Sequence, residues 1–199
     1  MTDTTPSHPR LILGSTSRYR RELLQRLHVP FDVASPDVDE TPHPAEAPRQ
    51  LALRLALAKA HAVAKQHPSC VVIGSDQVAD LDGTPLGKPG DHQRAVQQLQ
   101  QMRGRTVVFQ TAVAVVHLDA GFEQVDLAPV QVRFRALSDA AIEHYLRTEQ
   151  PYDCAGSAKS EGLGIALLES IDNDDPTALV GLPLIRTCRM LRAAGIPLL

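Results

Sequence analysis

The sequence predicts an α/β protein with a mixed central β-sheet flanked by helices. In the first half of the chain, short apolar runs alternate with stretches of helical periodicity, which is typical of strands alternating with helices. In the second half, two long strand-like runs at 106–118 and 122–134 flank a turn at 119–121 and predict an antiparallel pair. A late hairpin added to early alternation indicates a mixed sheet. With 199 residues and 43% hydrophobic residues, we expect one domain over 1–199 with a substantial core.

The N-terminal part is predicted to hold two short strands around one helix. The apolar run at 10–13 predicts a strand, 17–27 a helix with its leucines on one face, and 31–34 a second strand. Residues 1–9 are expected to form a flexible N-terminal extension. The prolines that recur between 35 and 48 exclude regular structure there and predict a loop.

The middle of the chain is predicted to continue the alternation. Residues 49–66 are rich in Ala and Leu at helical spacing and predict a helix, and 70–74 predict a buried strand. Asp82-Gly83 indicates a hairpin turn, which is followed by a loop at 87–90 and a helix at 92–102.

The C-terminal part is predicted to contain two further helices and one strand. Ser138 is a suitable N-cap for a helix over 139–149, and a polar loop follows at 151–164. The sequence then predicts a strand at 165–171, an acidic turn at 172–175 and a closing helix at 183–194.

Composition excludes several classes of protein. The formal net charge is −3, so no global field draws the chain to nucleic acid or to an anionic membrane. Aromatic residues make up only 4%, too few for a protein that stacks single-stranded bases. The three cysteines are widely spaced and form no C-x-x-C pair, which argues against a zinc site or a disulfide framework. No apolar run approaches a membrane span, and we expect a cytoplasmic protein.

The stretch Gly14-Ser15-Thr16-Ser17 joins the first predicted strand to the first predicted helix. Free backbone N–H groups and the positive end of the helix dipole make such a helix start a site for phosphate. Arg20 and Arg21 add guanidinium groups that suit phosphate oxygens, and Tyr19 offers a flat ring beside them. This combination favours a nucleotide. The alternative is an ordinary helix cap followed by a solvated basic face.

Other charged residues have both a chemical and a structural interpretation. Asp76 follows the end of a predicted strand, where it could hold a divalent metal, act as a general base, or only form a turn. Lys59 on an Ala-rich helix and Lys88 in a Gly-Lys-Pro-Gly loop could each bind phosphate or simply reach solvent. In the acidic loop around Glu40, one carboxylate could bind magnesium, and Glu161 lies in a polar loop of the kind that often carries function.

Together these residues resemble the Maf family of nucleoside triphosphate pyrophosphatases over nearly the full chain. The family's opening pattern resembles residues 14–21, with one extra residue before the Arg pair and with Gly14 and Arg18 where Ala and Pro are common. The remaining matches, in chain order, are Val38-Asp39-Glu40-Thr41, Lys59, Gly74-Ser75-Asp76-Gln77-Val78, Gly87-Lys88-Pro89 and residues 153–162.

The resemblance implies a function and a set of site residues. Members hydrolyse a nucleoside triphosphate to the monophosphate and pyrophosphate with a divalent cation, Mg²⁺ or Mn²⁺, in a cleft between two lobes, and homodimers occur. The implied catalytic residue is Asp76, as a base or a metal ligand, with Glu40 as its partner for the metal. The residues expected to hold the triphosphate are Ser15, Arg20, Arg21, Lys59 and Lys88.

Base preference is expected to follow Tyr19, Gln77 and Glu161. The pyrimidine-type branch typically has Thr after the aspartate and Gln in the late loop, so Gln77 and Glu161 resemble the branch acting on 7-methyl-GTP. A cationic 7-methylguanine suits the Tyr19 ring, Glu161 could accept its N1–H and amino group, and Gln77 could reach its carbonyl edge. The alternatives are dTTP, UTP or ITP as substrate, or a non-catalytic nucleotide-binding regulator of cell division.

Overall fold

The computed structural model describes residues 8–199 and shows a seven-stranded mixed sheet in the order β2-β1-β3-β5-β6-β7, with β4 paired to β3. Most of the extension expected over residues 1–9 lies outside the described residues. The strands are β1 (Leu11–Gly14), β2 (Asp32–Ala34), β3 (Val71–Leu81), β4 (Thr84–Leu86), β5 (Thr106–His117), β6 (Phe122–Phe134) and β7 (Leu168–Asp172). The α-helices are α1 (Arg18–Gln25), α2 (Pro48–Ala64), α3 (His92–Met102), α4 (Asp139–Glu149) and α5 (Leu184–Ala193).

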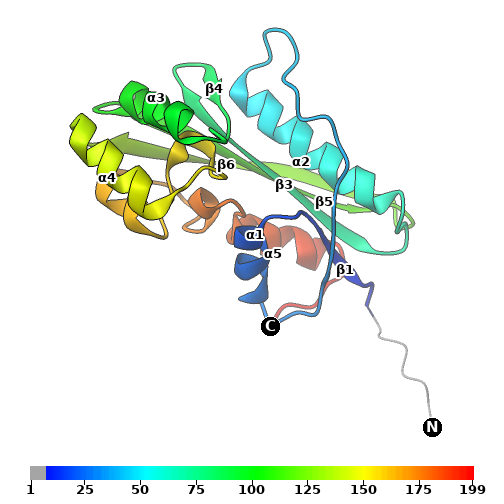
Figure 1. Cartoon of the computed structure of the whole chain (residues 1–199). Coiled ribbons are helices and arrows are strands. Elements are labelled where there is room, and N and C mark those ends of the chain that lie inside the picture. Colours follow the sequence, from blue (N-terminus) through cyan, green and yellow to red (C-terminus); the bar gives the residue numbers. More distant parts are fainter. Residues whose placement is uncertain (1–7) are drawn as a thin grey trace.

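The sheet is parallel at one end and antiparallel at the other. β1 pairs in parallel with β2 and β3, whereas β5, β6 and β7 follow β3 in antiparallel order. Helix α2 covers one face, α1 and α5 lie on the other, and α3 and α4 gather at the far end of the long strands (Figure 1). One buried hydrophobic cluster lies between the sheet and each of these three groups of helices. The predicted mixed α/β class is therefore confirmed.

β3 extends further than the sequence predicted. The expected strand at 70–74 continues to Leu81, because β5 pairs with it from Val72 to Asp80 and satisfies the backbone of its polar middle. Pairing with the shorter β1 ends at Gly74. Asp76 therefore does not follow the end of its own strand, as predicted, but lies in the middle of β3, just beyond the end of its neighbour β1.

The predicted strand at 165–171 is also displaced. A 3₁₀ helix, η2, occupies Leu163–Leu167, and the edge strand β7 begins only at Leu168. The chain folds back tightly before η2, since a Cβ on Gly164 would lie 2.4 Å from the carbonyl oxygen of Lys159. Alternating apolar residues resemble a strand, but this turn prevents pairing until Leu168. Two further 3₁₀ turns, η1 (Ala155–Ser157) and η3 (Ala178–Val180), flank this region.

Helix α2 lies directly on the backbone of β3 at Gly74. A Cβ at this position would lie 2.3 Å from the carbonyl oxygen of Ala56 and 2.5 Å from the amide nitrogen of Ala60. Only glycine permits so close an approach of helix and strand. Because Lys59 is on α2 and Asp76 is two residues beyond Gly74, this packing sets the distance between the two side chains. Within residues 8–199, the helices are too short or too polar to cross a membrane.

Candidate active site

A cleft of about 670 Å³ opens beside the point where β1 ends and β3 continues. Its walls come from the β1–α1 loop, the proline-rich loop, α2, the middle of β3, the loop after β4, the late polar loop and the η3 segment. The predicted site residues that line it are Ser15, Tyr19, Arg20, Glu40, Lys59, Asp76, Gln77, Lys88 and Glu161. Residues far apart in the chain therefore meet in one cleft.

Arg21 does not line this cleft. It is exposed on α1, whereas Arg18 and Arg20 line the cavity wall. Successive helical residues point about 100° apart, so a helix that turns Arg20 inward turns Arg21 away. The structure therefore does not support the expectation that both members of the Arg pair face the ligand.

Lys59 connects the two carboxylates of the cleft. Its Nζ lies 2.6 Å from Asp76 Oδ1 and 2.6 Å from Glu40 Oε1. The Lys59 and Asp76 side chains are only 7% and 10% exposed, whereas that of Glu40 is 58% exposed. The buried Lys59 ammonium thus holds a carboxylate from the proline-rich loop and a carboxylate from β3 close together. Lys59 is therefore not a lysine that merely reaches solvent.

The two carboxylates differ in their protonation behaviour. Burial raises the pKa of Asp76 above its ordinary value, although Lys59 and Arg20 act in the opposite direction. Partial burial also acts on Glu40, but its hydrogen bond and ion pair with Lys59 leave the pKa of Glu40 below its ordinary value. Asp76 is consequently the carboxylate whose surroundings make it the better proton acceptor.

Arg20 contributes a positive charge that no carboxylate neutralises directly. Its Nε donates to the carbonyl oxygen of Gly181 at 2.8 Å, and its Nη1 to Ser15 Oγ at 3.4 Å, and among residues 8–199 it forms no ion pair. Burial lowers the pKa of Arg20, whereas Asp76 and Glu40 raise it. A partly buried guanidinium without a counter-ion is costly unless an anion completes it. The cleft is therefore suited to an anionic ligand at this point.

The aromatic side of the cleft is formed by Tyr19. The guanidinium carbon of Arg18 lies 4.7 Å from the centroid of the Tyr19 ring, and Arg18 Nη2 donates to the Tyr19 hydroxyl at 2.7 Å. Cys154 Sγ lies 3.9 Å from the same hydroxyl, and burial raises the pKa of this thiol to about 12. The ring already accepts one cation in the cleft, and the neutral Cys154 thiol packs beside it.

The charged residues of the late polar loop have two roles: one holds the loop to α4, and others line the cleft. Lys159 pairs with Glu149, which also accepts the backbone N–H of Leu163, so this lysine holds the loop to α4. Glu161 is exposed and lines the cleft, as does Lys88 from the opposite loop. Of this loop's charged side chains, Asp153 and Glu161 therefore line the cleft and Lys159 stabilises the fold.

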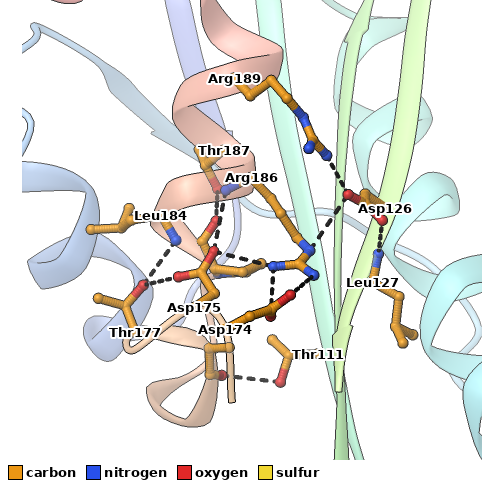
Figure 2. Close-up of polar contacts among 12 residues, drawn as sticks. Thr111, Asp126, Leu127, Asp174, Asp175, Thr177, Leu184, Arg186, Thr187 and Arg189 are labelled. Atoms are coloured by element: carbon orange, nitrogen blue, oxygen red, sulfur yellow. Dashed lines mark hydrogen bonds and ion pairs between the residues drawn. The ribbon is translucent and has the colours of Figure 1, made fainter. Parts of the chain in front are cut away.

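A polar network behind the cleft anchors the η3 segment (Figure 2). Arg186 on α5 forks onto Asp174 at 3.1 and 3.0 Å, and its backbone N–H donates to the fully buried Asp175 at 3.2 Å. Arg186 Nε lies 3.4 Å from Asp126 Oδ2 on β6 without making a hydrogen bond. These contacts tie η3 to α5 and β6, and η3 in turn forms one wall of the cleft.

Sequence reasoning missed this wall. The carbonyl oxygens of Ala178, Leu179 and Gly181 accept hydrogen bonds from Gln77, Thr111, Ser75 and Arg20. Backbone carbonyls carry no residue-specific signal. Thr111, however, is a polar residue within a strand otherwise dominated by Val and Ala, and that contrast was the available clue.

The fold and the site define a mixed α/β protein with a charge-lined cleft at the edge of its parallel strands. The chain belongs to the Maf family: the family described as Maf-like protein matches residues 10–194. A relative from Polaromonas sp. strain JS666, named 7-methyl-GTP pyrophosphatase, is 76% identical over 99% of this chain and 90% of the relative. Relatives of the same name from Albidiferax ferrireducens and Burkholderia thailandensis are 73% and 61% identical, over 98% and 96% of this chain and 98% and 91% of their own lengths. The Staphylococcus aureus Ham1 protein shares 16% identity over 64% of this chain and 72% of its own, with a TM-score of 0.48.

Proposed function

We propose that this chain hydrolyses 7-methyl-GTP to 7-methyl-GMP and pyrophosphate. The observation that carries the reaction class is the cleft in which Arg20 has no counter-ion among residues 8–199 and Asp76, Lys59 and Glu40 form one charged cluster. The substrate is supported by the relatives named 7-methyl-GTP pyrophosphatase, which this chain matches at up to 76% identity over nearly its whole length.

The triphosphate is held by the cations of the cleft. Lys59 takes up the charge of Glu40 and Asp76, whereas Arg20 and Lys88, which also line the cleft, form no ion pair within residues 8–199 and are available to bind phosphate. Ser15 Oγ, which already accepts from Arg20 and from the backbone N–H of Ser17, places its hydroxyl at the same point. Guanidinium and ammonium groups that face a phosphate bind it through charge-assisted hydrogen bonds.

A divalent cation, Mg²⁺ or Mn²⁺, fits the two carboxylates. Glu40 and Asp76 each place one oxygen 2.6 Å from Lys59 Nζ, so the two carboxylates lie close enough to one another to bind a common cation through their other oxygens. No cluster of three or more His, Cys, Asp or Glu ligands occurs within residues 8–199. One or two carboxylates completed by substrate phosphates and water is the usual way that proteins bind Mg²⁺. When bound, the cation would neutralise charge on the phosphate oxygens.

In the proposed reaction, water attacks the α-phosphorus in line with the bridging oxygen that leaves. A new bond forms from the water oxygen to phosphorus, and Asp76 accepts the proton. The bond from phosphorus to the bridging oxygen breaks, and its electron pair leaves with pyrophosphate. Arg20 and Lys88 hold the charge that develops on the leaving group, so positioning and electrostatics supply most of the acceleration.

The base is placed between Tyr19 and Glu161. A 7-methylated guanine is cationic, and the Tyr19 ring already binds the guanidinium of Arg18. The base replaces one cation on this ring by another, while the Glu161 carboxylate accepts a hydrogen bond from its N–H edge. We further propose that the protein acts in the cytoplasm, where a reducing environment suits its three free cysteines. The homodimer implied by the family stays a prediction.

The experiment that tests this function is pyrophosphate release from 7-methyl-GTP, GTP, dTTP, UTP, CTP and ITP, each with and without Mg²⁺. We expect metal-dependent release with a strong preference for 7-methyl-GTP. Preference for dTTP, UTP or ITP would retain the reaction and reject the substrate. No release from any of these nucleotides would favour the alternative of a non-catalytic regulator of cell division.

Replacing Tyr19 by Ala is expected to lower kcat/KM for 7-methyl-GTP more than for GTP. The stacking of a cation on an aromatic ring contributes about 0.5–2 kcal/mol, so the preference for the methylated base should fall about twofold to thirtyfold. Tyr19→Phe is the matched control: it removes the hydroxyl contacts with Arg18 and Cys154 but keeps the ring, and should keep the preference. Equal losses on both nucleotides in Tyr19→Ala would contradict a stacking role.

A further inference from the structure

The Gln77 side chain is held by three oxygen atoms on the η3 side of the sheet. Its Nε2 lies 2.9 Å from Thr111 Oγ1 and 3.0 Å from the carbonyl oxygens of both Ala178 and Leu179. The two carbonyls only accept hydrogen bonds. The Thr111 hydroxyl donates its own proton to the Ala178 carbonyl at 3.0 Å, so towards Gln77 it also acts as an acceptor. All three neighbours therefore require the N–H₂ end of the amide.

This environment determines which end of Gln77 faces the cleft. With Nε2 bound to the η3 wall, Oε1 is left without a hydrogen-bond partner among residues 8–199, in a side chain that lines the cavity. Rotating the amide would place Oε1 against the carbonyl oxygens of Ala178 and Leu179, which cannot donate, and would lose both of these hydrogen bonds. Gln77 therefore presents a hydrogen-bond acceptor, Oε1, to a ligand in the cleft.

The wall that holds Gln77 is itself rigidly placed. Thr111 is fully buried and lies directly opposite Gln77 in the β3–β5 register. Figure 2 shows Thr111 bonded to the η3 segment, with the Arg186 network behind that segment. On the cleft side, Gly181 accepts from Arg20 and Ser75. The position of the acceptor is therefore set by the fold and does not depend on the ligand.

We infer that Gln77 selects guanine over hypoxanthine by accepting a hydrogen bond from the base, and that Thr111 is the residue that positions it. This rests on the proposed function, and it reverses the expectation that Gln77 donates to the carbonyl edge. Gln77 Oε1 and the Glu161 carboxylate are both hydrogen-bond acceptors in the lining of the same cleft, and we take this wall to be the one that meets the base. The N1–H and the 2-amino group of guanine supply two donors to this wall, whereas hypoxanthine has only N1–H and leaves one acceptor unpaired.

The size of the discrimination follows from that unpaired acceptor. A polar group that loses its partner in a partly desolvated site weakens binding, so we expect 7-methyl-GTP to be preferred over 7-methyl-ITP by about fivefold to a hundredfold. Gln77→Met keeps the length of the side chain and removes the acceptor. This substitution should lower kcat/KM for 7-methyl-GTP and bring the ratio of kcat/KM for 7-methyl-GTP to that for 7-methyl-ITP close to one. A donor role towards O6, which both bases carry, would leave the ratio unchanged.

The positioning role of Thr111 has its own test. Thr111→Val keeps the shape and removes the hydroxyl, so Gln77 loses one of its three partners and the ratio should fall several-fold. Thr111→Ser keeps the hydroxyl and should keep the preference for 7-methyl-GTP. A residue with only a structural role would lower kcat/KM for both nucleotides in equal proportion. Thermal unfolding of each variant shows whether the fold is intact.

The same ratio is measured without turnover by calorimetric binding of 7-methyl-GMP and 7-methyl-IMP. A protein that releases no pyrophosphate yet binds the guanine form about tenfold more tightly would contradict the proposed function and support this inference. A protein that hydrolyses both triphosphates equally well, or whose preference survives in Gln77→Met, would overturn the inference and leave the proposed function standing.

Discussion

Asp76→Asn is expected to remove pyrophosphate release while leaving nucleotide binding measurable. The side chain is 10% exposed, sits in the middle of β3 and is paired with Lys59 at 2.6 Å. Asparagine has nearly the same shape, and its amide oxygen still accepts a hydrogen bond from Lys59, so the cleft should keep its form. It cannot take a proton from water. Loss of a general base costs about 10²–10⁴ in rate, and loss of a metal-binding carboxylate would add to that.

Two measurements separate chemistry from folding in this variant. Calorimetric titration with 7-methyl-GTP should show binding, and thermal unfolding should show an intact fold. Asp80→Asn is the matched control, because Asp80 lies on the same strand, outside the residues that line the cleft, and bonds to Gly83 and Gln110 instead. Near-normal turnover in Asp76→Asn would refute the assignment of Asp76.

The pH dependence of the unaltered protein should agree with this role. Burial raises the pKa of Asp76 above its ordinary value of 3.8, despite the nearby charges of Lys59 and Arg20. A base acts only when it is deprotonated, so kcat/KM should be maximal above this raised pKa and decline as the pH falls through it. The pH profile of the residual activity of Asp76→Asn should lack that limb.

The layered fold was largely predictable because its signals are local. Residues 106–118 and 122–134 were expected to pair, and β5 and β6 do pair from Thr106–Arg133 to His117–Phe122. Ser138 was expected to cap a helix, and it accepts the N–H of Ala141 at 3.2 Å. The errors concern long-range context. Polar residues 75–77 resemble the end of a strand until β5 is known to pair with them, and 163–167 resemble a strand until the turn at Gly164 is seen.

The candidate site was predictable in its residues but not in their partners. Lys59 and Asp76 could each be identified from the sequence, but nothing in the sequence shows that they meet at 2.6 Å with Glu40. The sequence does not distinguish Arg20 from Arg21, and only the orientation of α1 shows that Arg20 lines the cleft and Arg21 does not. The backbone carbonyls that orient Gln77 have no sequence signal at all. Side-chain identity is local information, whereas hydrogen-bond partners depend on tertiary structure.

Gly74→Ala is expected to have the largest effect on stability of any methyl-sized change in the sheet. The added Cβ would lie 2.3 Å from Ala56 O and 2.5 Å from Ala60 N, and both are backbone atoms of α2 that cannot rotate away. The helix must shift, which disrupts a fully buried contact surface and costs on the order of 3 kcal/mol. For a domain of this size, that loss lowers Tm by about 10 °C.

The same substitution should also impair catalysis, because α2 carries Lys59 and β3 carries Asp76. Moving the helix outward breaks the 2.6 Å contact between them, so kcat/KM should fall even at temperatures where the variant is fully folded. Gly87→Ala is the control for stability, since a Cβ there meets no atom within 4 Å, and Tm should be almost unchanged. Gly14→Ala, at the position paired with Gly74, places its Cβ 3.2 Å from Ile73 O and should have an intermediate effect. Gly74→Ala with wild-type Tm and activity would show that the helix–strand spacing does not govern the Lys59–Asp76 pair.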